Sequence, residues 1–255
     1  MSDKIWSHIQ HCSRAGKKLF ALLIDPDKSD KNGLNRTIRR AEQAGVDLFF
    51  VGGSLMTTTQ FEEILSHLSK HTHIPIILFP GSIYQIHPAA DAILLLSLIS
   101  GRNPELLIGK HVEAAPKLHK SGLEILSTGY ILIDGGRQTT VGYISNTLPI
   151  PREKPEIAAC TALAGNMLGM KLIFLDAGSG ATQTVPGEMI RQVRKVIDNI
   201  LVVGGGIRTP EQAFEVARSG ADIVVIGNHL EYHPERISSM AKAIHSAGSP
   251  SVKIS

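Results

Sequence analysis

Three glycine-rich stretches near the end of the chain carry the residues best suited to binding an anion. They read LDAGSG at 175–180, VGGGIR at 203–208 and IGN at 226–228, and each contains or directly follows the end of a short apolar run. Glycine at such positions lets the backbone bend sharply or approach a ligand closely. A single turn of this kind would be explained by chain reversal alone. Two adjacent turns beside the Ser179 hydroxyl favour a phosphate group held by backbone N–H groups and the start of a short helix.

Acidic and hydroxyl side chains at the ends of the first two apolar runs could hold a metal ion. Asp25, followed by Asp27 and Lys28, ends the first run, and Ser54 follows the second. A carboxylate with a hydroxyl suits Mg²⁺, which takes few protein oxygens and fills its shell with water and phosphate oxygens. A salt-bridged turn explains the same residues equally well, and the sequence leaves both interpretations open.

Two further side chains are candidates for acid–base chemistry. Asp176, inside the first glycine-rich stretch, could bind or activate a substrate hydroxyl. Tyr130 lies in the fifth apolar run and points either into the same site or into the core. Both are therefore candidate catalytic residues.

The elements that must position these residues are eight short apolar runs separated by segments with helical patterns. The runs span residues 19–25, 48–53, 74–79, 92–99, 124–133, 171–176, 201–203 and 222–226. Most are apolar at nearly every position, as strands covered on both faces should be. Repeated strand–helix alternation predicts an α/β fold with a parallel sheet, and eight repeats predict closure into a (β/α)8 TIM barrel. The carboxyl ends of its strands would bring the candidate residues to one mouth.

Three segments depart from this regular pattern. Residues 80–91 are few and interrupted by prolines, so we expect an irregular third βα unit without a helix. Residues 135–153 are long, polar and without helical period, which is typical of a functional loop serving as a lid or substrate wall. Residues 3–15 carry apolar side chains at helical spacing and are predicted to plug the barrel floor. Pro at a first helical position predicts helix starts at Asn103-Pro104 and Thr209-Pro210.

Composition bounds the class of protein. The 255 residues, 43% hydrophobic and 19% charged, fit one barrel domain over 1–255. A net charge of +3 without a dense basic run argues against a nucleic-acid partner. Two distant cysteines, Cys12 and Cys160, argue against a disulfide framework or zinc site and fit a reducing cytoplasm. The N-terminus lacks the apolar core of a signal peptide, and the longest apolar run is too short to span a bilayer, which leaves peripheral membrane contact open.

The order of motifs along nearly the whole chain resembles the geranylgeranylglyceryl phosphate synthase family, including its heptaprenylglyceryl phosphate synthase relatives. The matching stretches are ALLIDPDK, FVGGS, ILFPGS, LLLSLISGRNPELLIGKHVEAA, GYILIDGGRQTTVGYI, FLDAGSGA, VGGGIRTPEQA and ADIVVIGN. The resemblance implies Mg²⁺-dependent transfer of a prenyl group from a polyprenyl diphosphate to the 3-hydroxyl of sn-glycerol 1-phosphate. An ether would form and diphosphate would leave. Geranylgeranyl diphosphate is the expected donor, with its tail in an apolar trench near the third unit and the end of the fourth strand.

The resemblance also implies roles for residues and an assembly. Asp25 and Ser54 match the Mg²⁺ positions, and Asp176 is the candidate to orient or deprotonate the glycerol hydroxyl. The glycerol phosphate site would comprise Phe174, Leu175, Asp176, Ala177, Gly178, Ser179, Gly180, Gly205, Gly206, Gly227 and Asn228. Where many members carry Tyr-Leu-Glu, this chain has Phe174-Leu175-Asp176, so the tyrosine hydroxyl is lost and the carboxylate has a shorter arm. The RNPELLIGKHVEAA stretch resembles the oligomer-forming members, which implies a homo-oligomer, a dimer or a hexamer.

Two other classes of function remain as alternatives. A sugar-phosphate isomerase, or a related aldose isomerase of an amino-acid pathway, could use Asp25 and Asp176 as acid and base across the mouth without any prenyl trench. A non-catalytic phospholigand-binding barrel would bind glycerol phosphate and show no turnover. Release of diphosphate from a prenyl donor distinguishes both from a prenyltransferase.

Overall fold

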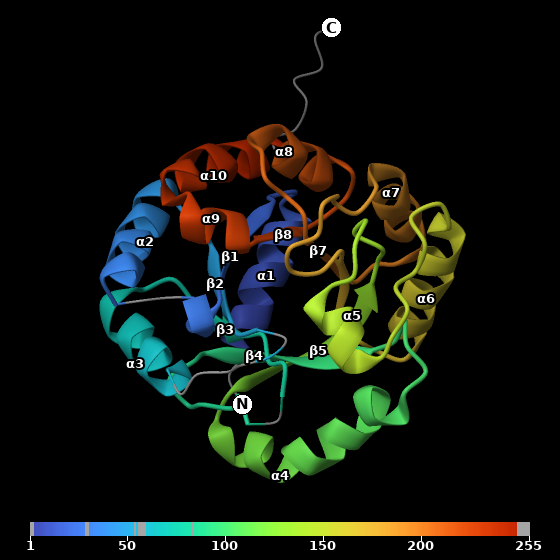
Figure 1. The fold of residues 1–255 in the computed structure, drawn as a ribbon, viewed down its shortest axis with the longest axis horizontal. Helices are drawn as coiled ribbons and strands as arrows, with labels where there is room; N and C mark the ends of the chain where they lie inside the picture. Colours follow the sequence, from blue (N-terminus) through green and yellow to red (C-terminus); the bar gives the residue numbers. More distant parts are fainter. Residues whose placement is uncertain (1–2, 29–30, 54, 56–59, 83, 249–255) are drawn as a thin grey trace, which may run out of the picture.

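The chain forms a closed barrel of eight parallel strands, as predicted. A computed structural model describes residues 3–28, 31–53, 55, 60–82 and 84–248, shown as a ribbon in Figure 1. The strands pair in sequence order around the barrel, and β1 closes it by pairing with β8. Their bounds are β1 Leu19–Ile24, β2 Leu48–Val51, β3 Ile76–Leu78, β4 Ala92–Leu98, β5 Glu124–Leu132, β6 Leu172–Asp176, β7 Ile200–Gly204 and β8 Ile223–Ile226.

The strands are apolar throughout because both of their faces are buried. Along β1, Ala21 belongs to the cluster that fills the barrel interior, whereas Leu22 belongs to the layer between strands and helices. Successive side chains of a strand point to opposite faces, so each strand must supply apolar residues to both layers. This double burial explains why the sequence shows continuous apolar runs rather than alternation.

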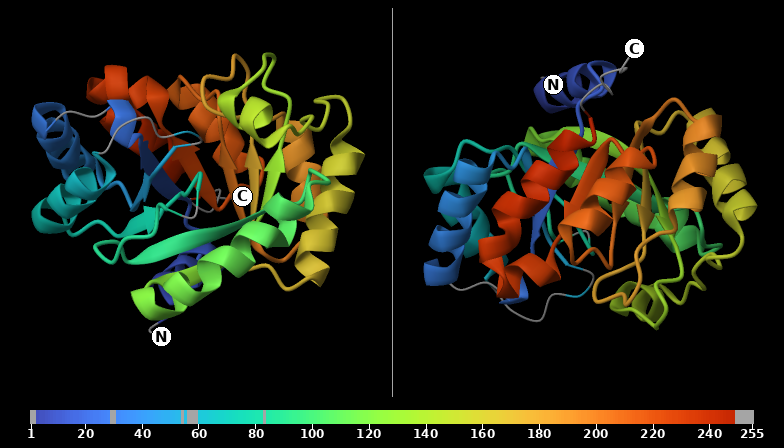
Figure 2. Two further views of the ribbon diagram at one scale, coloured as in Figure 1. Left: turned by 60° about the horizontal axis from the view of Figure 1, so that its bottom comes forward. Right: turned by 90° about the horizontal axis from the view of Figure 1, so that it is seen from above.

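An outer ring of helices covers the barrel (Figures 1 and 2). Its members are α2 Lys31–Ala44, α3 Phe61–His71, α4 Lys110–Ser121, α6 Pro155–Met167, α7 Gly187–Val196, α8 Pro210–Arg218 and α10 Ile237–Ser246. A π-helical turn, η2 Glu105–Gly109, leads into α4, so a helical segment begins just after Asn103-Pro104 as predicted. Thr209 caps α8 by accepting from the N–H of Gln212, with Pro210 in the first turn, also as predicted. Within the described residues, no helix is long and apolar enough to cross a membrane.

The two segments predicted to lack a helix, residues 80–91 and 135–153, differ in the structure. No helix separates β3 from β4 in the described residues 79–82 and 84–91, so the prediction of a helix-less third unit is confirmed. The prediction that 135–153 lacks helix is wrong for a short α5, Thr140–Ser145. Thr139 caps α5 by accepting from the N–H of Gly142, and Asn146 ends it in the left-handed conformation at φ 50°. These local caps define six helical residues, too few to produce a readable apolar period.

One end of the barrel is closed by α1, Lys4–Arg14, as predicted from its apolar spacing. Ile9, only 1% exposed, packs with the barrel interior, and so does Cys12. The N–H groups of Ile5 and Trp6 donate to the Glu124 carboxylate at 2.9 and 2.7 Å, which binds the start of the helix to the start of β5. Figure 2 shows α1 lying across this end, so the opposite end is the open mouth.

Three short elements complete the mouth. They are η1 Pro26–Lys28 after β1, α9 Asn228–Tyr232 after β8, and η3 Pro234–Arg236 before α10. Because β1 and β8 are neighbours in the barrel, η1 and α9 lie side by side above them.

Candidate active site

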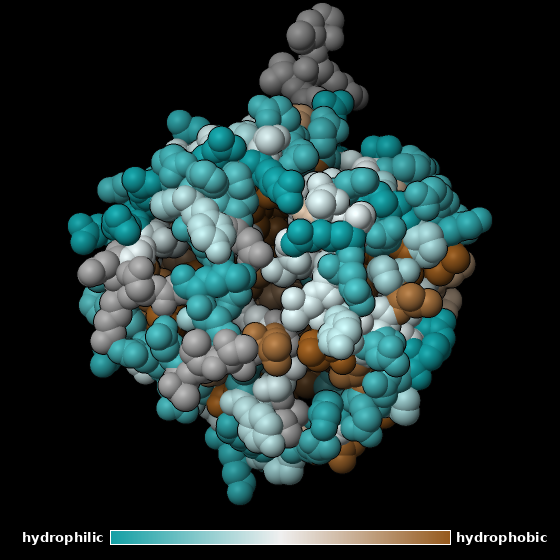
Figure 3. Space-filling model, in the orientation of Figure 1, coloured by the Kyte–Doolittle hydropathy of each residue, from teal (hydrophilic) through white to brown (hydrophobic). Residues whose placement is uncertain are grey.

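The mouth opens into a cavity of about 870 Å³. Figure 3 views the molecule from this side and shows a central hollow with hydrophobic residues in its depth. The cavity lining includes Asp25, Phe79, Tyr130, Asp176 and Gly205, each at or near the carboxyl end of a different strand. The barrel therefore brings together residues that lie far apart in the sequence.

The glycine-rich stretches form one cradle at the ends of β6, β7 and β8. Gly178, Gly180, Gly205 and Gly206 all have positive φ, at 88°, 76°, 86° and 73°. A Cβ at Gly205 would lie 2.7 Å from the backbone N of Gly178 and 2.8 Å from that of Ala177. The β7 turn thus packs directly on the β6 turn, an approach that requires glycine.

The cradle residues assigned from the sequence do not all face the cavity. Phe174, Asp176, Ser179 and the cradle glycines, with Gly227, line it. Leu175 and Ala177 are fully buried in the layer beneath the helices, so only their backbone can reach a ligand. Asn228 begins α9 directly after Gly227.

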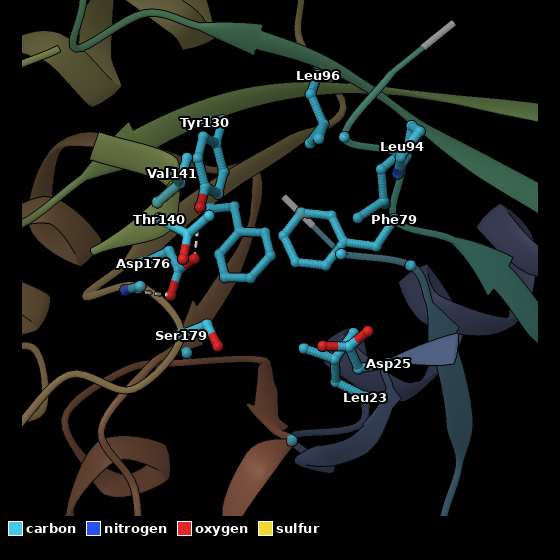
Figure 4. Close-up of a pocket in the computed structure, with 18 of the residues that line it drawn as sticks. Leu23, Asp25, Phe79, Leu94, Leu96, Tyr130, Thr140, Val141, Asp176 and Ser179 are labelled. Atoms are coloured by element: carbon cyan, nitrogen blue, oxygen red, sulfur yellow. Dashed lines mark hydrogen bonds between the residues drawn. The ribbon is translucent and has the colours of Figure 1, made fainter. Parts of the chain in front are cut away.

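Tyr130 and Asp176 form a hydrogen-bonded pair across neighbouring strands. The Tyr130 hydroxyl donates to Asp176 Oδ2, and the N–H of Gly178 donates to Oδ1 at 2.8 Å. Both side chains line the cavity, so the orientation of Tyr130, open from the sequence, is toward the mouth (Figure 4). Burial raises the pKa of Asp176, and the two hydrogen bonds partly oppose that rise. Burial, then the charge of Asp176, raises the pKa of Tyr130, so the phenol keeps its proton and donates.

On the opposite side of the mouth, Asp25 is the centre of a charged cluster. Its Oδ2 accepts from Lys28 Nζ at 2.7 Å, and its Oδ1 accepts from the Asp27 N–H at 3.1 Å. Its own N–H donates to Oε1 of Glu231 on α9 at 3.0 Å. The ion-paired turn that the sequence allowed is therefore present. Ser54, the other predicted metal position, lies outside the described residues.

The surroundings of Asp25 are compatible with a cation. The described residues contain no cluster of three His, Cys, Asp or Glu side chains that could hold a metal by themselves. Mg²⁺ does not need one, because water and substrate phosphate oxygens supply most of its shell. Oε2 of Glu231 is buried with no hydrogen-bond partner among the described residues, and the other oxygen of this carboxylate accepts from the Asp25 N–H. A buried carboxylate oxygen without a donor suits a positively charged ligand.

Sequence reasoning missed three residues that line or support the cavity. Arg208, quoted only as part of a motif, lines it and is held by a hydrogen bond from its guanidinium to the Ala181 carbonyl at 3.0 Å. Phe79 also lines it, although only its position at a strand end indicated this. Glu231 gave no signal beyond standing four residues after Gly227, because its contact with Asp25 depends on β1 and β8 being neighbours.

The aromatic residues of the cavity pack on one another between the two polar sides. The ring centroid of Phe79 lies 5.4 Å from that of Phe174 and 6.0 Å from that of Tyr130. Figure 4 shows Phe79 between Asp25 and the Tyr130–Asp176 pair. The mouth therefore has an apolar centre with a polar group on either side.

The cavity continues as an apolar branch on the outer side of β4. Ile93 and Leu95, which point to the helix layer, line it together with Ala114 and Leu118 of α4. Ile86, from the helix-less segment between β3 and β4, lines it too. In a regular barrel unit a helix covers the outer face at this point. Its absence leaves room for the branch.

Stability should fall as the pH rises through the pKa of Glu231. Burial is the main cause that raises this pKa from 4.5 to about 6. Because the folded-state pKa exceeds the unfolded one, the stabilising contribution is full below about pH 4.5 and is lost as the pH rises through about 6. We expect Glu231→Gln to gain up to about 2 kcal/mol relative to the parent protein between pH 4.5 and pH 8. Urea unfolding at several pH values measures this difference.

Glu215→Gln is the matched control for this substitution, because Glu215 lies exposed on α8, in a helix away from Asp25. Its stability should follow the parent protein across the pH range. A Glu231→Gln curve parallel to that of the parent protein would contradict the assignment.

Comparison with known proteins agrees with this architecture. The PcrB family model matches residues 13–247. A geranylgeranylglyceryl phosphate synthase of Spirosoma linguale is 50% identical over 230 residues, covering 90% of this chain and 92% of the relative. One of Chitinophaga pinensis is 49% identical over 247 residues, covering 97% and 98%.

Among solved structures, (S)-3-O-geranylgeranylglyceryl phosphate synthase from Thermoplasma acidophilum in complex with substrate sn-glycerol-1-phosphate is similar. Its TM-score is 0.89 at 33% identity, covering 95% of this chain and 98% of that chain. A tryptophan synthase subunit alpha of Legionella pneumophila, at 16% identity and a TM-score of 0.61, shares the fold alone. The resemblance found in the sequence is confirmed. With a family match over most of its length and relatives near 50% identity, this chain belongs to the PcrB family.

Proposed function

We propose that this protein is a prenyltransferase that joins a polyprenyl group to the 3-hydroxyl of sn-glycerol 1-phosphate as an ether. The observation that carries the proposal is the two-sided mouth. The glycine cradle and the Tyr130–Asp176 pair lie on one side, Asp25 and Lys28 lie on the other, and an apolar cavity lies between. Relatives named geranylgeranylglyceryl phosphate synthase, and a solved one bound to sn-glycerol-1-phosphate, support it.

The cradle side suits the acceptor. Backbone N–H groups at the glycine turns can hold the phosphate, and the Arg208 guanidinium beside them adds positive charge. A phosphate there brings the glycerol hydroxyl within reach of Asp176. Asp176 is the proposed base, held by the Gly178 N–H and the Tyr130 hydroxyl so that its carboxylate has one orientation. The phenol that donates to this carboxylate comes from Tyr130 on the neighbouring strand β5.

The opposite side suits the leaving diphosphate. Asp25, with Ser54 as the second proposed ligand, would hold Mg²⁺, and the ion when bound neutralises charge on the diphosphate. The Lys28 ammonium, 2.7 Å from Asp25, adds a second positive charge at the same place. Fixing both reactants in one cavity can itself supply much of the rate, because well-oriented groups react as if at ~10⁵ M or more.

The apolar branch beside β4 and α4 is the proposed place of the prenyl tail. Ala114→Trp should fill this branch and disfavour long donors. We expect the ratio of kcat/KM for a C20 donor to that for a C10 donor to fall by at least about tenfold. A series of C10 to C35 diphosphates measures the preference. Ala115→Trp, one residue along α4 and exposed, is the control and should leave it unchanged. An unaltered preference in Ala114→Trp would place the tail elsewhere.

One experiment tests the reaction itself. The protein is incubated with sn-glycerol 1-phosphate, geranylgeranyl diphosphate and Mg²⁺, and the products are identified by mass spectrometry. We expect the prenyl ether and one equivalent of diphosphate, both abolished by EDTA and restored by Mg²⁺. Ether formation in EDTA would refute the metal assignment. Failure to form ether with any prenyl donor would favour the isomerase or the non-catalytic binding barrel.

Two properties of the whole molecule complete the proposal. A homo-oligomer, dimer or hexamer, is supported by the exposed Ile108 and Val112 on η2 and α4. Peripheral membrane contact is supported by the exposed Tyr143 and Leu148 in the loop at the mouth, where a lipid-like donor would enter. Sedimentation analysis and vesicle flotation measure the two properties separately.

A further inference from the structure

The ring of Phe79 occupies the middle of the mouth. Phe79 follows β3 directly, is partly exposed, and lines the cavity with Asp25 and Asp176. Figure 4 shows its side chain between Asp25 and Tyr130. A group bound between the two polar sides therefore lies against this ring.

The position of Phe79 is fixed by its neighbours. Its N–H donates to the Val51 carbonyl at 2.9 Å, and a Cβ at Gly52 would lie 2.0 Å from its carbonyl oxygen, so the β2 backbone packs tightly against it. Phe50 contacts the ring edge to face at 6.3 Å between centroids. The ring centroids of Phe79 and Phe174 are 5.4 Å apart, which leaves no room for a third group between them, so a ligand would reach Phe79 from the cavity that it lines.

The proposed reaction develops positive charge at this place. The C1–O bond of the donor breaks, and its electron pair leaves with the diphosphate. The glycerol 3-hydroxyl oxygen then forms the new bond to C1, and its proton passes to the Asp176 carboxylate. C1 must therefore lie between the diphosphate near Asp25 and Lys28 and the hydroxyl near Asp176. In Figure 4 the Phe79 side chain lies beside the space between Asp25 and Asp176, and all three residues line the same cavity.

An aromatic ring suits a carbocation better than a charged side chain does. The π face attracts a cation electrostatically, most strongly where water is excluded. A carboxylate in contact with C1 would instead capture the cation as an ester. A phenyl ring has no lone pair with which to do so.

We propose that Phe79 is a catalytic residue whose π face stabilises the developing allylic cation at C1 of the prenyl donor. This role rests on the proposed prenyl transfer. It differs from a role in tail binding, because it acts on the rate of bond breaking and not on donor affinity.

Stepwise fluorination of the ring tests the role. Phe79 is replaced in the full chain by 4-fluoro-, 3,5-difluoro- and 3,4,5-trifluorophenylalanine, which weaken the π face with little change of shape. The single-turnover rate with geranylgeranyl diphosphate should fall at each step, by roughly tenfold over the series, while the donor KM stays within about twofold. Phe79→Leu, which keeps an apolar side chain, should lower kcat by at least as much.

Phe50 is the matched control. It is fully buried, packs behind Phe79 and is not part of the cavity lining, so the same fluorinated series there should leave the rate unchanged. A flat series at Phe79, or an equal fall at both positions, overturns the proposal. If the parent protein makes no prenyl ether at all, the proposed function fails, which is a separate result. Thermal melting of each variant shows that it is folded before rates are compared.

Discussion

Asp176→Asn is expected to lower kcat for prenyl transfer by roughly 10²- to 10⁴-fold while leaving the affinity for sn-glycerol 1-phosphate within about threefold. Asn keeps the shape of the side chain and can still accept the Gly178 N–H, which is 2.8 Å from the carboxylate. It cannot take a proton from the glycerol hydroxyl. Rapid-quench kinetics and calorimetric titration of glycerol phosphate measure the two quantities.

Asp134→Asn is the matched control. Asp134 follows β5, and its carboxylate accepts from the N–H of Gly136 at 2.9 Å, just as Asp176 accepts from the N–H of Gly178. Asp134 is not part of the cavity lining, and its substitution should leave the rate unchanged. Full prenyl transfer in Asp176→Asn with unchanged glycerol phosphate affinity would exclude Asp176 as the base.

Tyr130→Phe gives an independent measurement of the same pair. The Tyr130 hydrogen bond lowers the pKa of Asp176 against the effect of burial, so its loss should raise that pKa further. A base must be deprotonated to act, and the acidic limb of the pH–kcat profile should therefore move to higher pH. A structural role alone would lower the rate without moving the limb.

Gly205→Ala is expected to weaken sn-glycerol 1-phosphate binding by roughly 10- to 100-fold. Overpacking of this kind typically costs about 1–3 kcal/mol, and the cradle must recover its shape to bind the phosphate. Gly205 has φ 86°, and a Cβ there would lie 2.7 Å from Gly178 N and 2.8 Å from Asp176 Oδ1. The β6 and β7 turns would have to separate, which moves the backbone N–H groups proposed to hold the phosphate. Calorimetric titration with glycerol phosphate measures the loss.

Gly169→Ala separates this clash from backbone strain. Gly169 has nearly the same φ, 78°, but an added Cβ would meet nothing within 4 Å. It should lose about 1 kcal/mol of stability from the left-handed conformation and retain full affinity. If Gly205→Ala binds glycerol phosphate like the parent protein, the cradle is not the phosphate site.

The sequence alone was sufficient to predict the barrel and which strand ends contribute residues to most of its mouth. Strands buried on both faces must be apolar at nearly every position. The apolar run at 171–176 therefore predicted β6, and its bounds agree with Leu172–Asp176 to within one residue. Glycines that follow such runs predicted close backbone approach, and the positive φ of Gly205 and Gly206 confirms it. A missing helix could be predicted because prolines and a short spacing exclude one.

Only the tertiary structure decided which side chains meet. Tyr130 could have faced either side of β5, and the register that pairs it with Phe174 on β6 places its hydroxyl on Asp176. Glu231 reaches Asp25 across 206 residues because barrel closure makes β8 the neighbour of β1. The physical reason is common to both. Local patterns record how each residue is buried, whereas contacts between strand ends depend on register and closure, which no local pattern contains.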